Sequence, residues 1–374
     1  MTARLILTGP LAWPPLLARL AGEGLAAAGR RAALSDVAIA DTDACFPPAV
    51  LAPGGLAPAL LIDAPAPEIF ARLSYLAAAI GMVPVPRHVG QSGADGAALA
   101  FLDPTPGAVG QVPWNMAVWA DRWGDIALSA ADEIIGYLGR VPAGDLGWRM
   151  PMILARAASR QAARHAAPAT LRSETGTESV EMLARDTPHA GFFLTRAYDL
   201  RPPAFGGGIG EEVRREVFVA TDAALVLPYD PARDRVLVVE QFRMGPYGRG
   251  DPRPFVLEPV AGRVDAGETP EAAARRECLE EAGLTLAGLE HITSHYCSPG
   301  CSTEFYHCYL GLADLPVLER GSGGLASEHE DIRTHVVTFD AAMALMDSGE
   351  ANIGPLVLML LWLQRERARL RAAA

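Results

Sequence analysis

The chain has 374 residues, of which half are hydrophobic and 20% are charged. This length and composition exclude an intrinsically disordered chain and indicate a globular protein with two domains. The formal net charge is -12 and every basic residue is Arg, with no Lys in the chain. We therefore expect no nucleic-acid partner, because nucleic-acid-binding proteins usually carry a basic surface.

The cysteine content and the apolar segments favour a cytoplasmic protein with no membrane partner. There are five Cys, an odd number, and the first residues contain an Arg and no long apolar segment typical of a secretory leader. The apolar run 355–363 has only about half of the ~20 residues needed to span a bilayer. Reduced thiols in a cytoplasm are therefore the expected state.

The first 170 residues indicate a small α+β domain. Short apolar runs broken by Pro and Gly predict strands over 5–7, 59–62 and 97–102. Apolar residues at helical spacing predict helices over 116–140 and about 150–167. The polar segment 173–179 follows. We therefore assign residues 1–170 to a first domain, a mixed β-barrel-like α+β fold, and residues 180–374 to a second.

The second domain begins with a hairpin signal, because strand-like segments 223–228 and 236–241 flank the turn 230–234. A helix is then predicted from its ends. Thr269 is a candidate N-cap, Pro270 suits the first helical position, and Gly283 can stop the helix in a left-handed conformation. The remaining predicted elements are strands over 255–260, 303–312 and 333–338 and helices over 340–346 and 355–371.

The helix that starts at Pro270 gathers carboxylates on one side. At ~100° per residue, Glu277, Glu280 and Glu281 lie within an arc of about 100°. Like charges at this spacing repel one another, and a hard divalent cation such as Mg2+ or Mn2+ would offset the repulsion. The alternative is a solvated acidic face that binds no ion, which is the commoner fate of Glu-rich helices.

Residues 262–284 read GRVDAGETPEAAARRECLEEAGL and match the pattern G-x5-E-x7-R-E-U-x-E-E-x-G-U, where U is a bulky aliphatic residue. Cys278 takes the first U position, and a buried Cys behaves as a small hydrophobe. On these residues the chain resembles the Nudix hydrolases. The resemblance implies an α/β/α sandwich over residues 180–374. The motif residues with a structural role are Gly262, Glu268, Arg276 and Gly283.

The Nudix resemblance also implies the chemistry. Mg2+, or Mn2+ in its place, would be held by the four positions Ala261 (through its carbonyl), Glu277, Glu280 and Glu281, with Glu280 also counted as catalytic. Arg276 and Glu268 would form a pair that orients the loop and the helix. The reaction is substitution by water at a phosphorus atom of a nucleoside diphosphate linked to another group.

Residues outside this motif point to a substrate. Pro299 stands sixteen residues after Gly283, within S-P-G-C-S-T-E at 298–304, and this setting resembles the ADP-ribose pyrophosphatase subfamily. The stretches 214–218, 240–243 and 325–333 also resemble this subfamily. The resemblance implies that Arg215 and Arg243 face the substrate phosphates and that Ser298 and Glu304 bind substrate, with Glu304 on the distal ribose. It also implies that Glu328 activates the attacking water. The expected reaction converts ADP-ribose to AMP and ribose 5-phosphate.

Several alternatives stay open. A lone Arg is more often a surface residue, and Glu330 competes with Glu328 for the water-activating role. The subfamily often has E-R-G after the position of Phe218, where this chain has 219–221 VAT, so another nucleotide sugar or a dinucleotide remains a candidate substrate. A non-catalytic nucleotide sensor is the alternative from another class. The Cys297-x3-Cys301 spacing does not indicate zinc.

Two further expectations follow from resemblance alone. The ADP-ribose pyrophosphatases are homodimers, and segment 190–216 could supply the exchanged strands. Residues 5–11 resemble the Y-G-T-L loop of gamma-glutamylcyclotransferase-like domains, but Thr8 replaces the loop Tyr and 73–80 contains no Glu for proton transfer. We therefore predict a non-catalytic first domain. Its fusion to a Nudix module resembles bacterial tellurite-resistance proteins, a label for a phenotype and not for a reaction.

Overall fold

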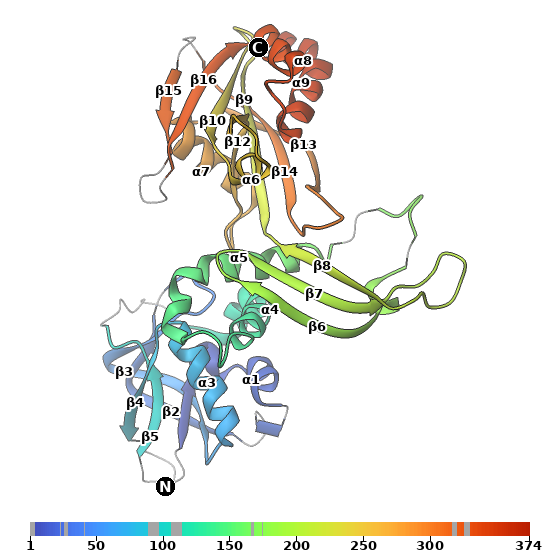
Figure 1. Ribbon diagram of the computed structural model, residues 1–374. Helices are drawn as coiled ribbons and strands as arrows, with labels where there is room; N and C mark the ends of the chain where they lie inside the picture. The colour runs from blue at the N-terminus through green and yellow to red at the C-terminus, as the bar shows by residue number, and fades with distance from the viewer. Residues whose placement is uncertain are drawn as a thin grey trace. The chain divides into compact units, whose positions relative to one another are not determined.

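The computed structural model describes residues 4–22, 24–25, 29–40, 42–88, 97–105, 114–165, 168–173, 175–315, 320–324 and 330–374. The chain divides into two compact units, Met1–Ala167 and Pro168–Ala374 (Figure 1). No described helix is both long enough and apolar enough to be a candidate membrane span.

The first unit contains a five-stranded sheet in the order β2-β3-β1-β5-β4. Its strands are β1 (Leu5–Thr8), β2 (Arg30–Ile39), β3 (Ala49–Ile62), β4 (Val83–His88) and β5 (Ala97–Leu102). The helices are η1 (Gly9–Ala12), α1 (Pro14–Ala21), α3 (Pro67–Ala79), α4 (Met116–Ile135), η2 (Ala143–Arg149) and α5 (Met150–Ala162). Strand β1 is buried along its whole length and pairs antiparallel with β3 and parallel with β5.

The α+β class expected for this unit is confirmed, and four details of the prediction are wrong. The described strands form an open path with β2 and β4 at its ends, so they do not close into a barrel. The helix predicted over 116–140 ends at Ile135, before Gly136, and the one over 150–167 ends at Ala162. The run 59–62 is only the end of the much longer β3, because Pro and Gly within 49–62 do not break this strand.

The second unit holds two sheets. The larger has the order β13-β14-β9-β10-β16-β15, with β11 on β10 and β12 on β9, and the smaller is the antiparallel sheet β6-β7-β8. The strands are β6 (Glu181–Ala190), β7 (Leu194–Arg201), β8 (Val213–Val219), β9 (Asp222–Asp230), β10 (Arg235–Phe242), β11 (Phe255–Glu258), β12 (Val260–Arg263), β13 (Gly288–Tyr296), β14 (Phe305–Leu312), β15 (Arg320–Gly323) and β16 (Ile332–Thr338). The helices are η3 (Thr177–Ser179), α6 (Met244–Arg249), α7 (Pro270–Ala282), α8 (Phe339–Ser348) and α9 (Gly354–Ala372).

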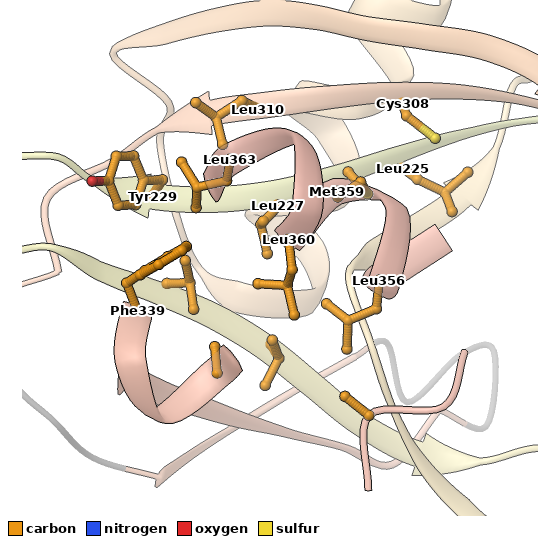
Figure 2. Close-up of a cluster of buried hydrophobic side chains, with 14 of the residues drawn as sticks. Leu225, Leu227, Tyr229, Cys308, Leu310, Phe339, Leu356, Met359, Leu360 and Leu363 are labelled. Carbon is orange, nitrogen blue, oxygen red and sulfur yellow. The ribbon is translucent and has the colours of Figure 1, made fainter. Parts of the chain in front are cut away.

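The larger sheet lies between two helical layers. Alternation along β9 sends Ala224 and Val226 into one hydrophobic cluster with residues of α7. The intervening Leu225, Leu227 and Tyr229 enter a second cluster with residues of α8 and α9, and Figure 2 shows these side chains beside Leu356, Met359, Leu360 and Leu363. A sheet buried on both faces by helices is an α/β/α sandwich, which confirms the predicted architecture.

The hairpin predicted at the start of the second domain is confirmed, but the single strand predicted over 255–260 is wrong. Strands β9 and β10 form the predicted hairpin, with Asp230 opposite Arg235 across the turn. The single strand predicted over 255–260 is instead two strands with different partners, β11 on β10 and β12 on β9. Pro259 separates them. Because Pro has no backbone N–H, it interrupts the ladder where the chain changes partner.

Candidate active site

Helix α7 is fixed at both ends by the residues that the sequence singles out. The Ala272 N–H donates to Thr269 Oγ1 at 3.2 Å, and Pro270 occupies the first helical position. Gly283 ends the helix with φ of 63°, a left-handed conformation that favours glycine. The predicted caps are therefore confirmed. They fix where the helix begins and ends, and hence which turns carry its carboxylates.

Glu281 is the most buried acid of α7, with 2% of its surface exposed. The Ala261 N–H of β12 donates to Glu281 Oε2 at 3.2 Å, so the strand and the helix meet at this carboxylate. Burial raises the pKa of Glu281 to about 8; repulsion from Glu277 and Glu330 adds to this effect, and the Ala261 N–H opposes it. The site therefore holds a carboxyl group whose charged form is only partly compensated.

Glu277 packs against the backbone of Gly262. A Cβ atom at position 262 would overlap the Glu277 carboxylate, so glycine lets this carboxylate lie against β12 in the position that it takes here. Burial raises the pKa of Glu277, while the neighbouring Arg276 opposes the rise. The absence of a side chain at Gly262 thus leaves room for the Glu277 carboxylate between strand and helix.

Arg276 joins the loop before α7 to the helix itself. Its Nε and Nη2 donate to the two carboxylate oxygens of Glu268, each at 3.0 Å, and Nη2 also donates to the Arg263 carbonyl at 3.0 Å. Its Nη1 donates to Glu277 Oε1 at 2.5 Å and to Glu280 Oε2 at 3.0 Å. One guanidinium therefore positions three of the motif acids, and a bidentate pair of this kind is geometrically specific.

The acids of α7 suit a hard cation by chemistry, although they do not enclose one as they stand. Within the described part of the chain, no three acidic, His or Cys side chains are grouped so that they could hold a metal ion. Arg276 currently takes oxygens of Glu277 and Glu280. The buried Glu281 carboxyl offers oxygen ligands, and its pKa stays raised to about 8 although the charge of Arg243 opposes the rise. This combination fits Mg2+ or Mn2+.

Arg243 lies beside the acids of α7. Its Nε donates to Glu258 Oε2 at 2.7 Å, and its charge lowers the pKa of Glu281, which places the guanidinium within electrostatic reach of that carboxyl. Burial raises the pKa of Glu258, and Arg243 opposes the rise. Sequence reasoning missed Glu258. Its only signal was an acidic residue inside an otherwise apolar strand.

The segment 298–304 forms a turn next to the end of β8. The Ser298 carbonyl accepts from the Cys301 and Ser302 N–H groups, and the Phe218 N–H donates to the Cys301 carbonyl at 2.8 Å. Glu304 Oε2 accepts from the Tyr306 hydroxyl at 3.1 Å. These contacts give the turn a fixed place beside the smaller sheet.

The structure does not bring every candidate residue to α7. Arg215 is exposed on β8, where its Nη1 donates to the Arg214 carbonyl at 2.9 Å. Among the described residues, no hydrogen bond or ion pair connects Arg215, Ser298 or Glu304 to α7. Glu328 lies outside the described residues.

Glu330, two residues after Glu328, is the alternative candidate for activating water and lies within the described residues. It raises the pKa of both Glu277 and Glu281 through charge repulsion. Its Cβ also lies next to Gly324, whose N–H donates to the Glu280 carbonyl at 3.3 Å. The segment that carries Glu330 therefore passes close to the C-terminal turn of α7.

The amino-acid sequence is similar to a known domain family and to several enzymes. The model of the NUDIX domain family matches residues 219–357. ADP-ribose pyrophosphatase from Escherichia coli (strain K12) is 39% identical over 204 residues, which cover 54% of this chain and 97% of the relative. ADP-ribose pyrophosphatase from Haemophilus influenzae is 37% identical over 196 residues, or 52% of this chain and 90% of the relative. GDP-mannose pyrophosphatase from Pectobacterium atrosepticum is 31% identical over 169 residues, or 45% and 86%.

Proposed function

Because the chain belongs to the Nudix family, within its ADP-ribose pyrophosphatase subfamily, and is a hydrolase of pyrophosphate bonds, we propose that it converts ADP-ribose to AMP and ribose 5-phosphate. The observation that carries the proposal is the packing of Glu277 and Glu281 against β12, with Glu280 joined to Glu277 through Arg276 and Arg243 within electrostatic reach of Glu281. Such a site would join acids that can hold a divalent metal to an Arg suited to phosphate.

The residues that would hold the metal are Glu277, Glu281 and the Ala261 carbonyl, with Glu280 close by. We propose Mg2+ as the physiological ion and Mn2+ as a substitute. When bound, the metal would polarise phosphoryl oxygens and acidify water. Arg276 would keep its bidentate contact with Glu268 and so hold the loop in place.

We assign substrate binding and the transfer of the water proton to side chains of this protein. The Arg243 guanidinium would neutralise a phosphate of the substrate, since Arg suits bidentate contacts with phosphate oxygens. Glu258 would hold that guanidinium in position. Arg215, Ser298 and Glu304 are proposed as further substrate contacts. Glu328 would take the proton of the attacking water, with Glu330 as the alternative acid.

A substrate panel tests the proposal. The full chain would be incubated with ADP-ribose, GDP-mannose, NADH and oxidised nucleoside triphosphates, in Mg2+ and in EDTA, and the products separated by chromatography. We expect the highest kcat/KM on ADP-ribose, equal yields of AMP and ribose 5-phosphate, and no turnover in EDTA. Preferred cleavage of another compound in the panel would reject ADP-ribose as the substrate.

The second candidate substrate is a nucleotide sugar. Its support is the similarity to GDP-mannose pyrophosphatases and the sequence 219–221 VAT, where the subfamily often has E-R-G. Loss of an Arg there would remove a phosphate contact and relax the preference for ADP-ribose. The same panel separates the two candidates, since a GDP-mannose enzyme would release GMP and mannose 1-phosphate.

We propose that the protein is a homodimer that associates through the sheet β6-β7-β8. Strand β6 is exposed along most of its length, and this strand and the turn that follows it carry exposed apolar side chains that water would otherwise contact. These side chains are Met182, Leu183, Phe192 and Phe193. Light scattering after size-exclusion chromatography should give twice the chain mass of 39.5 kDa. A single monomer peak at micromolar concentration would reject the dimer.

We also propose that the first unit does not catalyse. The Thr8 hydroxyl, at the position of the cyclotransferase loop Tyr, donates to the Pro58 carbonyl at 2.6 Å and is buried. The buried acid Glu133 pairs with Arg156 at 2.5 Å, so its charge is already compensated. The full chain carrying Glu281→Gln should release no 5-oxoproline from gamma-glutamyl peptides. Release by that variant would overturn this assignment.

A further inference from the structure

One buried polar side chain beside the candidate active site has an unused donor. Gln241, on β10, is 7% exposed, and its Nε2 makes no hydrogen bond to any described residue. A buried amide group without a partner destabilises a fold, so most buried polar groups in native proteins are paired. An exception at the edge of an active site is a candidate contact for a bound ligand.

The direction of this side chain follows from strand alternation. Leu237 and Val239 of β10 pack in the hydrophobic cluster that contains the α7 residues Ala274 and Cys278. Gln241 follows Val239 by two residues in the same strand, so its side chain lies on the α7 face of the sheet. The helix α7, which carries the acids, packs on this same face of the sheet.

The same alternation continues to Arg243. Its backbone is extended, with φ of -129° and ψ of 134°, so Gln241 and Arg243 project from the same side of the chain. Gln241 pairs across the ladder with Val256, two residues before Glu258, the carboxylate that holds Arg243. A neutral donor and a charged donor thus lie next to each other on one face.

We propose that Gln241 binds substrate, its Nε2 donating a hydrogen bond to an oxygen of the same diphosphate that Arg243 neutralises. This inference rests on the proposed function and adds a residue to it. A phosphate oxygen is the acceptor that the surroundings favour. Arg243, on the same face, is suited to phosphate oxygens, and among the described residues Gln241 Nε2 donates to no protein acceptor. Arg243 supplies the charge, and Gln241 fixes the orientation.

Two variants and a control test the inference. Gln241→Met keeps the length of the side chain and removes the donor. Gln241→Glu keeps the shape and places an acceptor against the phosphate. The control is Gln161→Met in the first unit, where Gln161 Oε1 is also buried without a hydrogen-bond partner among the described residues. For each protein we would measure the ligand-free melting temperature and, by calorimetry, the Kd of the α,β-methylene analogue of ADP-ribose in Mg2+.

The expected result has two parts. Gln241→Met should melt at the same or a higher temperature than wild type without ligand, because it removes an unsatisfied donor. It should nevertheless bind the analogue roughly ten- to a hundredfold more weakly, the usual size of a lost hydrogen bond to a charged group. Gln241→Glu should bind more weakly still. Gln161→Met should bind as tightly as wild type.

Other outcomes overturn specific claims. A Gln241→Met protein that melts well below wild type and binds the analogue normally would show that Nε2 has a structural partner such as a buried water. Normal binding by both Gln241 variants would also reject the inference while leaving the proposed function intact. If wild type itself bound neither this analogue nor a GDP-mannose counterpart, the proposed function would fail and this inference with it.

Discussion

At the scale of single residues, the site is defined by Glu281, a buried carboxyl whose charge the protein alone does not balance. It accepts a hydrogen bond from the Ala261 N–H and is attracted by the charge of Arg243, but burial and repulsion from Glu277 and Glu330 outweigh both. Burying an unpaired charge is costly, so such a group is either protonated or neutralised by a bound cation. A bound divalent ion would neutralise the Glu281 carboxylate. The unfavourable burial of this group is therefore a reason to expect an ion there.

Replacing Glu281 tests this account. Glu281→Gln should reduce kcat on the order of a thousandfold or more, a loss comparable to that of other electrostatic groups in active sites. The metal-free variant should melt no lower than wild type, since Gln removes an uncompensated acid. The surface change Glu290→Gln serves as the control and should retain full activity. Near-normal turnover by Glu281→Gln would show that this carboxylate does not serve the reaction.

The pKa of Glu281 also sets how metal binding depends on pH. The folded, metal-free protein keeps this carboxyl protonated below about pH 8, whereas a metal ion requires the carboxylate. Binding at pH 7 should therefore release a proton, and the affinity for Mn2+ should rise between pH 6 and about 8 and then level off. Calorimetry in buffers of different ionisation enthalpy measures the proton count. Equal affinity and no proton release across this range would contradict the assignment.

At the scale of secondary-structure elements, the site depends on the close approach of β12 to α7. Three contacts define it: the Ala261 N–H to Glu281, the backbone of Gly262 against Glu277, and Arg276 between Glu268 and the helix. The caps at Thr269 and Gly283 fix the helix along its axis. A small displacement of either element would therefore change the separation of the carboxylates.

Gly262→Ala should disturb this approach directly. The new Cβ would overlap the Glu277 carboxylate, so we expect a loss of about 1–3 kcal/mol in the free energy of unfolding, as for other overpacked sites. The kcat should fall as well, because Glu277 must turn away. Urea unfolding and initial rates measure the two effects. Gly248→Ala, where a Cβ meets open space, is the matched control. Equal behaviour of the two variants would refute the steric argument.

The parts of this site that sequence reasoning predicted are those with local causes. Thr269, Pro270 and Gly283 act on their own helix, and the spacing of the acids along α7 follows from helical geometry. The parts that it missed depend on contacts between distant segments. The split of 255–260 into β11 and β12 and the burial of Gln241 and Glu258 require the strand pairing, which no local pattern contains.

At the scale of the whole chain, each unit has its own core. The two hydrophobic clusters that enclose the larger sheet of the second unit contain only residues from positions 223 to 370. The first unit buries its own strands, including the whole of β1. Since neither of these clusters in the second unit draws on the first, the catalytic unit has the internal packing expected of an independent domain.

Separating the units tests this division. Residues 168–374 expressed alone should fold and hydrolyse ADP-ribose with a kcat/KM within about threefold of the full chain, because a domain with its own core keeps its site geometry. Circular dichroism and initial rates are the measurements. An insoluble or inactive fragment would mean that the first unit contributes to the folding of the second or to its site.

The central claim is that the acids of α7 hold a divalent cation next to a bound diphosphate. The most direct test is a crystal structure of the full chain with Mn2+ and the α,β-methylene analogue of ADP-ribose, with the ion identified by its anomalous scattering. The account predicts Mn2+ bonded to oxygens of Glu277 and Glu281 and in contact with the diphosphate, with Arg243 on the phosphates. A diphosphate bound elsewhere, or an ion that contacts neither glutamate, would contradict it.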